Sequence, residues 1–299
     1  MESVLSFDPM DMEQPLRHHF LLSAVAPRPI CFASTVDSAG NVNLSPFSFF
    51  NVFSSNPPIL VFSPARSGRD NSQKDTHQNV LDLPEVVINI VNYDMVEQMS
   101  LSSTAYPKGV NEFIKAGFTE VASHKVAPPR VKEAPVALEC TVDQVISLGD
   151  GPGAGNLIIA RVVYMHVKKA FLDERGKLDT TKLDLVARMG GKWYTRVIPE
   201  SLFEIPKPLK ELGIGVDQLP ERIRNSPILS GNNLGRLGNL KKLPSTADIE
   251  AVSQMQPVQA LLPQSKDDFK VFHQLAKTWI EAGQTEAALQ LLLFSESLL

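Results

Sequence analysis

Hydroxyl and amide side chains interrupt the apolar runs in the first third of the chain. This polar set comprises Ser34, Thr35, Asn43, Ser45, Ser48, Asn51, Ser63, Lys74, Asp75, Thr76 and Asn79. In a strand through residues 45–51, the two-residue period would place Asn51 on one face and Ser48 on the other. A buried polar group without a partner costs about 1–3 kcal/mol, so these side chains need hydrogen-bond partners.

The polar set is of the kind that binds a large planar molecule. A flavin ring with its ribityl chain and phosphate carries donors and acceptors along an apolar plane, and would supply those partners. Lys74, Thr76 and Asn79 stand near the expected start of a helix, where free backbone N–H groups and a cation suit a phosphate. In the alternative interpretation, the hydroxyls and amides bond to nearby backbone, and Lys74 is a solvated charge paired with Asp70 or Asp75.

Motifs of catalysis by side chains alone are missing from the sequence. It has neither a G-x-S-x-G elbow nor a G-x-x-x-x-G-K-[ST] phosphate loop, and its six histidines lack the spacing of a zinc site. Residues 149–154 fit the G-x-G-x-x-A pattern, but a strand-like run at 156–160 follows where a dinucleotide site needs a helix. We therefore expect a hairpin loop there and no metal site, and we assign no side chain a catalytic role.

Composition and charge narrow the class of protein. The 299 residues include 29 Lys and Arg against 33 Asp and Glu, which gives a net charge of −4. The sequence therefore lacks the excess of basic residues that is typical of a nucleic-acid-binding protein. No run of 18 apolar residues occurs, and the acidic residues 1–14 lack the features of a signal peptide. Cys31 and Cys140 lie in apolar runs and are expected to be reduced core thiols. These features predict a soluble cytoplasmic protein with neither a nucleic-acid nor a membrane partner.

Short β-branched runs separated by turn residues dominate residues 27–198 and predict an antiparallel sheet or barrel. The expected strands are residues 30–36, 42–53, 59–63, 86–91, 136–147, 156–167 and 193–197. Asp, Ser, Gly and Asn at 36–41 predict a tight hairpin between the first two. Two short helices are expected, at 72–83 and 94–103.

The composition changes after Pro199. Five prolines and five glycines without sustained periodicity mark residues 206–245 as a linker or wrapping segment. From Lys266 onward, apolar residues recur at helical spacing, and Gly283 separates this helix from a second one at 285–294. We thus expect two domains, 1–205 and 206–299, the second ending in a helical hairpin that is either a packing element or a partner-binding surface.

Several separated motifs together resemble those of the flavin reductase-like family. They are Pro27-Arg28-Pro29-Ile30, Ser34-Thr35-Val36, the run from Asn43 to Asn51, Pro57-Pro58, Lys74-Asp75-Thr76, Asn79, Val87-Ile88-Asn89 and the run from Ala187 to Tyr194. They occur in the expected order and span roughly residues 15–200. The tail beyond Ile198 lies outside the resemblance.

The resemblance implies a fold and a cofactor site. The fold would be mainly β, an FMN-binding split β-barrel with short helices, to which this chain adds a C-terminal α-helical extension. FMN would bind noncovalently near a homodimer interface, with NADH or NADPH as the electron donor. The cofactor-binding positions carried over are Ser34 and Thr35 beside the flavin, Ser48 and Asn51 at its polar edge or ribityl chain, Ser63, the phosphate set Lys74, Asp75, Thr76 and Asn79, and Tyr194, with Arg188 beside it.

The implied activity is that of an NAD(P)H-dependent, flavin reductase-like oxidoreductase acting on a small-molecule substrate. Two alternatives stay open. One is an oxygenase-type flavoenzyme whose organic substrate lies under residues 225–235, and the other is a non-catalytic FMN-binding interaction protein whose C-terminal hairpin contacts a partner.

Overall fold

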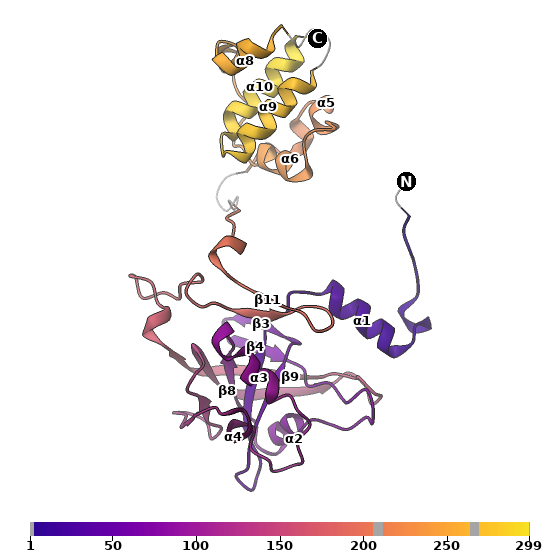
Figure 1. The fold of residues 1–299 in the computed structure, drawn as a ribbon, viewed down its shortest axis with the longest axis vertical. Helices are drawn as coiled ribbons and strands as arrows, with labels where there is room; N and C mark the ends of the chain where they lie inside the picture. The colour runs from indigo at the N-terminus through magenta and orange to yellow at the C-terminus, as the bar shows by residue number, and fades with distance from the viewer. Residues whose placement is uncertain (1–2, 206–211, 264–268, 299) are drawn as a thin grey trace. The chain divides into compact units, whose positions relative to one another are not determined.

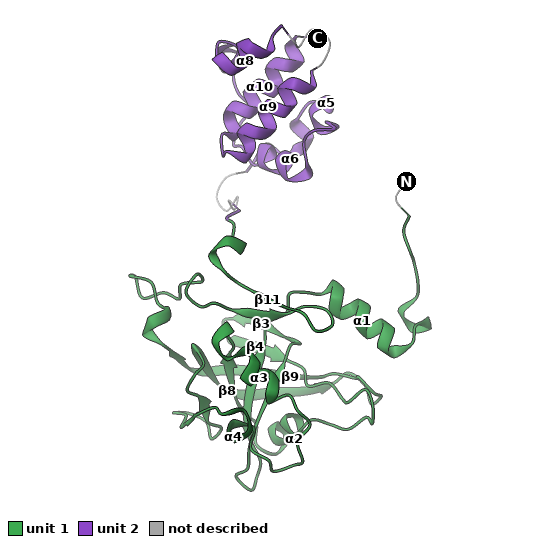
Figure 2. Cartoon of the chain, viewed as in Figure 1, with its two compact units in different colours: residues 1–203 green, residues 204–299 purple. Residues whose placement is uncertain are grey.

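The computed structural model describes residues 3–205, 212–263 and 269–298. It divides into two compact units, which we call unit 1, Met1–Phe203, and unit 2, Glu204–Leu299 (Figure 2). Each cluster of buried hydrophobic side chains falls within one unit or the other. The two units are therefore described separately.

Unit 1 is built on an antiparallel sheet of seven strands, in the order β2-β1-β5-β8-β9-β4-β3. Their bounds are β1 Cys31–Val36, β2 Val42–Phe47, β3 Phe50–Ser55, β4 Pro58–Phe62, β5 Glu85–Ile90, β8 Val136–Ser147 and β9 Asn156–Val167. The edge strands β2 and β3 follow one another in the chain, joined only by residues 48–49. Three residue steps span at most about 11 Å, so the sheet must curl until its edges nearly meet. This curling makes the sheet a barrel.

One expected strand is wrong in its extent. The run 42–53 is split by a bend at Ser48 and Phe49, here called the 48–49 bend, because its two halves pair with opposite edges of the sheet. The two-residue alternation across Ser48 and Asn51 therefore does not hold. Ser48 lies partly buried in the bend, whereas Asn51 is exposed on β3.

The other expected strands lie within about two residues of observed ones, and β8 and β9 match their predicted bounds. The expected helix at 72–83 is α2, Asp75–Asp82, and that at 94–103 is a 3-10 turn, Tyr93–Met95, followed by α3, Val96–Leu101. The remaining elements of unit 1 were not expected: the 3-10 turns Pro9–Asp11, Lys169–Phe171 and Pro199–Ser201, α1 Gln14–Ala24, α4 Glu112–Ala116, β6 Glu120–Val121, β7 Arg130–Val131 and β10 Val186–Arg188. Strand β10 pairs with β11, Tyr194–Arg196, which lies within the expected strand at 193–197. Helix α1 buries none of its residues, which explains its weak apolar periodicity.

The interior of the barrel is apolar and includes both thiols. Phe62, Ile88 and Ile158 are fully enclosed there beside Cys31 and Cys140, which are free cysteines. Burial raises the pKa of Cys140 to about 12 and also raises that of Cys31, so both stay protonated. A second cluster packs outside the barrel, where α3 and α4 cover one wall (Figure 1).

Unit 2 is helical. Its elements are a 3-10 turn Val216–Gln218, α5 Glu221–Arg224, α6 Gly231–Gly238, α7 Thr246–Val252, α8 Gln256–Leu261, α9 Lys270–Glu281 and α10 Thr285–Ser297. Helices α9 and α10 are the expected hairpin, and Gly283 between them adopts a φ of +80°. The expected first residue of that hairpin, Lys266, lies outside the described residues.

The proline- and glycine-rich segment contains helices that the sequence interpretation lacked. From residue 212 onward it contributes α5 and α6, and Leu219, Ile223 and Leu237 are buried in the core of unit 2. Its residues 206–211 lie outside the described part. Among the helices of the described ranges, none has the length and apolar character needed to cross a membrane.

Candidate cofactor site

Three segments of unit 1 are tied together by backbone hydrogen bonds: the 48–49 bend, the loop at 63–74 between β4 and α2, and the loop at 148–155 between β8 and β9. The Ser63 N–H donates to the Phe49 carbonyl at 2.9 Å, and the Arg66 N–H donates to the Ala154 carbonyl at 2.8 Å. The Asn156 amide adds a bond to the Pro64 carbonyl at 3.1 Å. These bonds hold the side chains of the 63–74 loop in a defined place.

Three polar side-chain atoms on the 63–74 loop are buried and unpaired: the acceptor Asn71 Oδ1 and two donors. Within the described residues, neither Ser63 Oγ nor Arg66 Nε has a hydrogen-bond partner. Gly155 permits the close approach of the neighbouring loop, because a Cβ there would lie 2.7 Å from Ser63 Oγ. Since buried donors are normally paired, an unpaired hydroxyl and an unpaired guanidinium nitrogen on one loop indicate a bound anion such as a phosphate.

A cavity of about 670 Å³ adjoins two of these segments, the 48–49 bend and the 148–155 loop. This volume is within the range of small-molecule sites, about 300–1,000 Å³. The residues that line it are Met10, Gln14, Arg17, His18, Leu21, Leu22, Val25, Arg28, Phe49, Leu148, Gly151, Pro152, Gly153 and Ala154. Helix α1 thus forms one wall, and the 48–49 bend and the 148–155 loop form the other.

Four buried side chains of the predicted set and its surroundings bond to one another. The Asn43 amide donates to Thr76 Oγ1 at 2.8 Å and to Thr35 Oγ1 at 3.3 Å, and the Asn79 amide donates to Thr35 Oγ1 at 3.1 Å. Ser34 Oγ is likewise buried and donates to the Pro129 carbonyl. The structure therefore brings Thr35, Thr76 and Asn79 together, and their bonds fasten α2 to β1 and β2.

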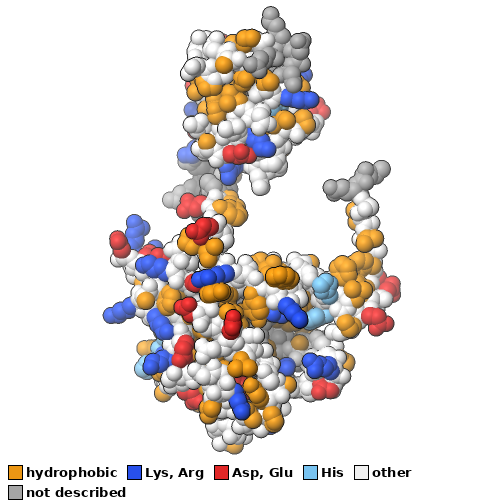
Figure 3. All heavy atoms as spheres, viewed as in Figure 1, with side chains coloured by type: hydrophobic (Ala, Val, Ile, Leu, Met, Phe, Trp, Pro, Cys, Tyr) orange, Lys and Arg blue, Asp and Glu red, His pale blue; other side chains and the backbone are white. Residues whose placement is uncertain are grey.

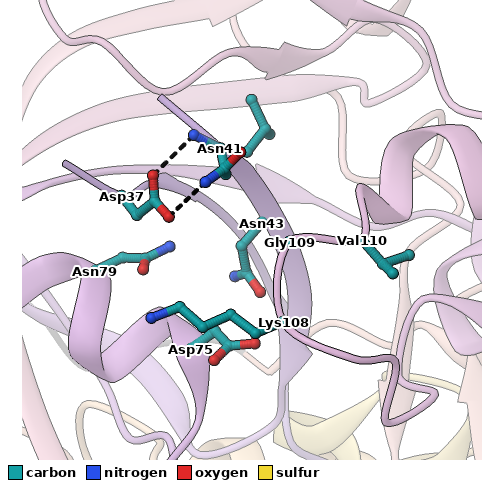
Figure 4. A pocket seen from close by; sticks show the side chains of 9 residues that line it. Asp37, Asn41, Asn43, Asp75, Asn79, Lys108, Gly109 and Val110 are labelled. Atoms are coloured by element: carbon teal, nitrogen blue, oxygen red, sulfur yellow. Dashed lines mark hydrogen bonds between the residues drawn. The ribbon is translucent and has the colours of Figure 1, made fainter. Parts of the chain in front are cut away.

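Asp75 and Asn79 line a second, much smaller pocket. It holds about 10 Å³, which is about one water, and two carboxylates, Asp37 and Asp75, face it with Lys108 (Figure 4). Hydrogen bonds from Asn41 are the main cause that lowers the pKa of Asp37. A pocket of this size with two carboxylates does not suit a phosphate.

The other predicted residues are more accessible. Lys74 is exposed at the residue before α2, and the Asn51 Oδ1 accepts a bond from the Val52 N–H at 2.8 Å. Tyr194 lies on β11, where the Arg188 guanidinium carbon is 4.6 Å from its ring centroid. Ser48 alone of the set lies in the 48–49 bend beside the cavity residue Phe49.

Two arginines shape the site, and sequence reasoning missed Arg66. The signal for it was an arginine three residues after Ser63, in the loop that follows the expected strand at 59–63. Arg28 is buried and donates to the carbonyls of Val25, at 2.6 Å, and Met189, at 2.9 Å. Burial and the charge of Arg188 lower the pKa of Arg28. Arg28 therefore ties the end of α1 to the β10–β11 hairpin, next to which α1 lies (Figure 1).

Comparisons with known proteins agree with this architecture. The family model of the flavin reductase like domain matches residues 23–182. An uncharacterized protein of Aquifex aeolicus is 36% identical over 188 residues, which cover 63% of this chain and 93% of that protein. Nitrilotriacetate monooxygenase component B from Bacillus cereus superposes with a TM-score of 0.64 at 29% identity, covering 69% of this chain and 100% of that one.

An FMN-binding protein from Thermus thermophilus shares the fold, with a TM-score of 0.53 at 18% identity, covering 68% of this chain and 100% of that one. The family and the split-barrel fold expected from the sequence are both confirmed, as is the presence of additional C-terminal helices. The matched residues make up more than half of the chain. The chain therefore belongs to the family of proteins that contain a flavin reductase-like domain.

Proposed function

We propose that the chain is an FMN-binding oxidoreductase that takes electrons from NADH or NADPH and passes them to a small-molecule acceptor. The observation that carries this proposal is the pair of buried, unpaired donors, Ser63 Oγ and Arg66 Nε, on a loop bonded to two residues that line a cavity of about 670 Å³. Membership of the flavin reductase-like family supports a flavin as the ligand. When bound, FMN supplies a ring that accepts a hydride and releases electrons one or two at a time.

The residues of the site divide into those that would contact FMN and those that position them. Ser63 and Arg66 would hold the phosphate, and Lys74 at the end of the same loop remains our assignment for an additional charge. Ser48 and Asn51 remain our assignments for the ribityl chain or ring edge, and Tyr194 for the rim of the pocket. We assign Ser34, Thr35, Thr76 and Asn79 a positioning role, because their polar atoms already have partners within the protein. Asp75 is placed with them at the start of α2.

We further propose that the active form is a homodimer and that FMN lies near its interface. The edge strand β3 exposes Val52 and Phe53, which are 62% and 68% accessible, and α1 exposes Phe20 and Leu21. Hydrophobic side chains follow the N-terminal segment in the surface view (Figure 3). Exposed apolar side chains on an edge strand and on a helix are surface that a second copy would cover. The two reduced, buried cysteines suit a reducing compartment such as the cytoplasm.

The first test is the visible spectrum of the protein purified without added cofactor, followed by addition of NADH or NADPH under nitrogen. We expect flavin bands at about 370 and about 450 nm, and bleaching by the reduced nicotinamide. A colourless protein that takes up no added FMN would disprove the cofactor. A yellow protein that neither nicotinamide bleaches would leave FMN binding in place and disprove the electron donor.

The phosphate assignment has its own test. Removing a charge-assisted hydrogen bond costs about 1.5–3 kcal/mol, so Arg66→Gln should weaken FMN binding by about 10- to 150-fold. Ser63→Ala should weaken it by less, because the hydroxyl is neutral. Arg175→Gln, at an exposed arginine in a turn far along the chain, is the matched control and should leave the affinity unchanged. Equal FMN affinities of all three variants in equilibrium titration would remove the assignment.

A further inference from the structure

The 670 Å³ cavity has walls of different chemistry. Phe49, Leu148 and Pro152 give the barrel side an apolar surface, whereas α1 contributes Arg17 and His18 together with Leu21 and Leu22. Among the fourteen lining residues there are two arginines and one histidine, and none is acidic. The cavity is therefore largely apolar and carries positive charge without any negative charge.

The cationic wall is held in place. The terminal nitrogens of Arg28 donate hydrogen bonds to backbone carbonyls at the end of α1 and in the β10–β11 hairpin, so Arg28 anchors the helix. Arg17 donates from Nη1 to the Pro9 carbonyl at 3.1 Å, which fixes its guanidinium at the cavity wall. The Gln14 amide packs against Gly153 and closes one side of the cavity. The packing is close enough that a Cβ at residue 153 would lie 2.6 Å from Gln14 Nε2. A preformed charged wall of this kind binds an anion with little loss of side-chain freedom.

This wall is distinct from the FMN phosphate site proposed above. Ser63 and Arg66 do not line the cavity. They connect to it only through backbone bonds, to Phe49 and Ala154. Arg66 of the phosphate site and Arg17 of the cavity are thus separate cationic positions in unit 1. A cofactor phosphate would occupy the first, which leaves the second for another anion.

We infer that the cavity is the substrate subsite of the proposed flavoenzyme and takes a planar molecule with a carboxylate, sulfonate or phosphate group. The planar body would lie against Phe49, Leu148 and Pro152, and Arg17 would bind the anionic group with His18 beside it. The inference rests on the proposed function for its redox role, but the charge preference is a property of this chain's own residues. Arg17 is thereby a specificity-determining residue.

The test compares two planar probes of nearly equal size, 4-nitrobenzoate and the neutral 4-nitrobenzyl alcohol. Each is titrated calorimetrically into the FMN-loaded, oxidised protein without any reductant, so binding is read without turnover. We expect the carboxylate to bind at least about tenfold more tightly, as one charge-assisted bond implies. Arg17→Gln should abolish the preference, Arg17→Lys should keep part of it, and Arg175→Gln should keep it whole.

Other outcomes separate this inference from the proposed function. Equal dissociation constants for the two probes in the unaltered protein, or an unchanged ratio in Arg17→Gln, would overturn the subsite. If Arg17→Gln instead weakens FMN binding, Arg17 belongs to the cofactor and the inference fails while the proposed function stands. If the unaltered protein binds no FMN, the proposed function fails, and the same probe pair titrated into the protein as purified still decides the charge preference of the cavity.

Discussion

The two units have cores made of different groups. Unit 1 encloses hydroxyls, amides and carboxylates within its sheet, among them Thr35, Asn89 and Glu139, each fully buried. The described core of unit 2 is almost wholly aliphatic and aromatic around Phe272 and α10. Burial alone would raise the pKa of Glu139, but bonds from the His124 N–H, His166 and the Lys125 N–H lower it overall. Unit 1 thus buries polar groups by pairing them, which specifies one arrangement of its loops.

Some buried polar atoms in the described part of each unit lack a hydrogen-bond partner, and their surroundings differ between the units. In unit 1, Ser63 Oγ and Arg66 Nε are unpaired on a loop whose backbone bonds to two residues that line a cavity, Phe49 and Ala154. In unit 2, His273 Nε2 is unpaired inside an apolar core, and its Nδ1 lies 2.7 Å from Ser226 Oγ. An unpaired buried polar atom therefore indicates a binding site in unit 1 and a sensitivity to protonation in unit 2.

The largest effect should come from truncating the apolar core of unit 2. Phe272 is 1% exposed, and Phe272→Ala should lower the free energy of unfolding of unit 2 by about 3–5 kcal/mol, because it leaves a cavity. FMN binding in unit 1 should be unchanged. Differential scanning calorimetry with the flavin spectrum followed in parallel measures both. Leu212→Ala, at a residue of unit 2 that is 93% exposed, is the control; loss of FMN from the Phe272 variant would show that the cores are not independent.

A somewhat smaller effect should follow from His273. Burial first, and the charge of Arg222 second, lower its pKa from 6.5 to about 4. Between those pH values the unfolded chain binds the proton more tightly, so unit 2 should lose up to about 3 kcal/mol as the pH falls from 6.5 to 4. Urea unfolding at several pH values measures this slope.

His273→Gln separates this histidine from the carboxylates that titrate in the same range. The variant should show a shallower loss of stability of unit 2 than the unaltered protein across that window. Parallel curves for the two proteins would mean that His273 titrates normally in the folded state. The unpaired nitrogen in unit 2 would then not make that unit sensitive to protonation.

The smallest effect should come from the polar cluster in unit 1. Asn43→Ala removes the donor that Thr76 Oγ1 and Thr35 Oγ1 share, and should destabilise unit 1 by about 1–3 kcal/mol. Asn41→Ala, at an exposed amide bonded to Asp37, should cost less. Denaturation followed by the flavin signal reports on unit 1 alone. Equal losses in the two variants would indicate that burial adds nothing to this cluster.

Local patterns in the chain were enough for much of the fold. Two long β-branched runs, β8 and β9, lie at their predicted bounds, because each strand is read from its own apolar residues and the turn that follows. The α9–α10 hairpin was equally local, with Gly283 supplying the positive φ between its helices. In contrast, α1 gave no usable pattern, since it buries no residue.

The sequence by itself determined the family, the positions of most strands in an antiparallel sheet or barrel, and the apolar setting of both cysteines, because these follow from residue types within local motifs. Only the tertiary structure decided the break at Ser48 and Phe49, because that break depends on which sheet edges the flanking strands pair with. It also separated Thr35, whose hydroxyl is bonded within the protein, from Ser63, whose hydroxyl is not. Hydrogen-bond partners distant in the chain make that distinction, and residue type alone does not contain it.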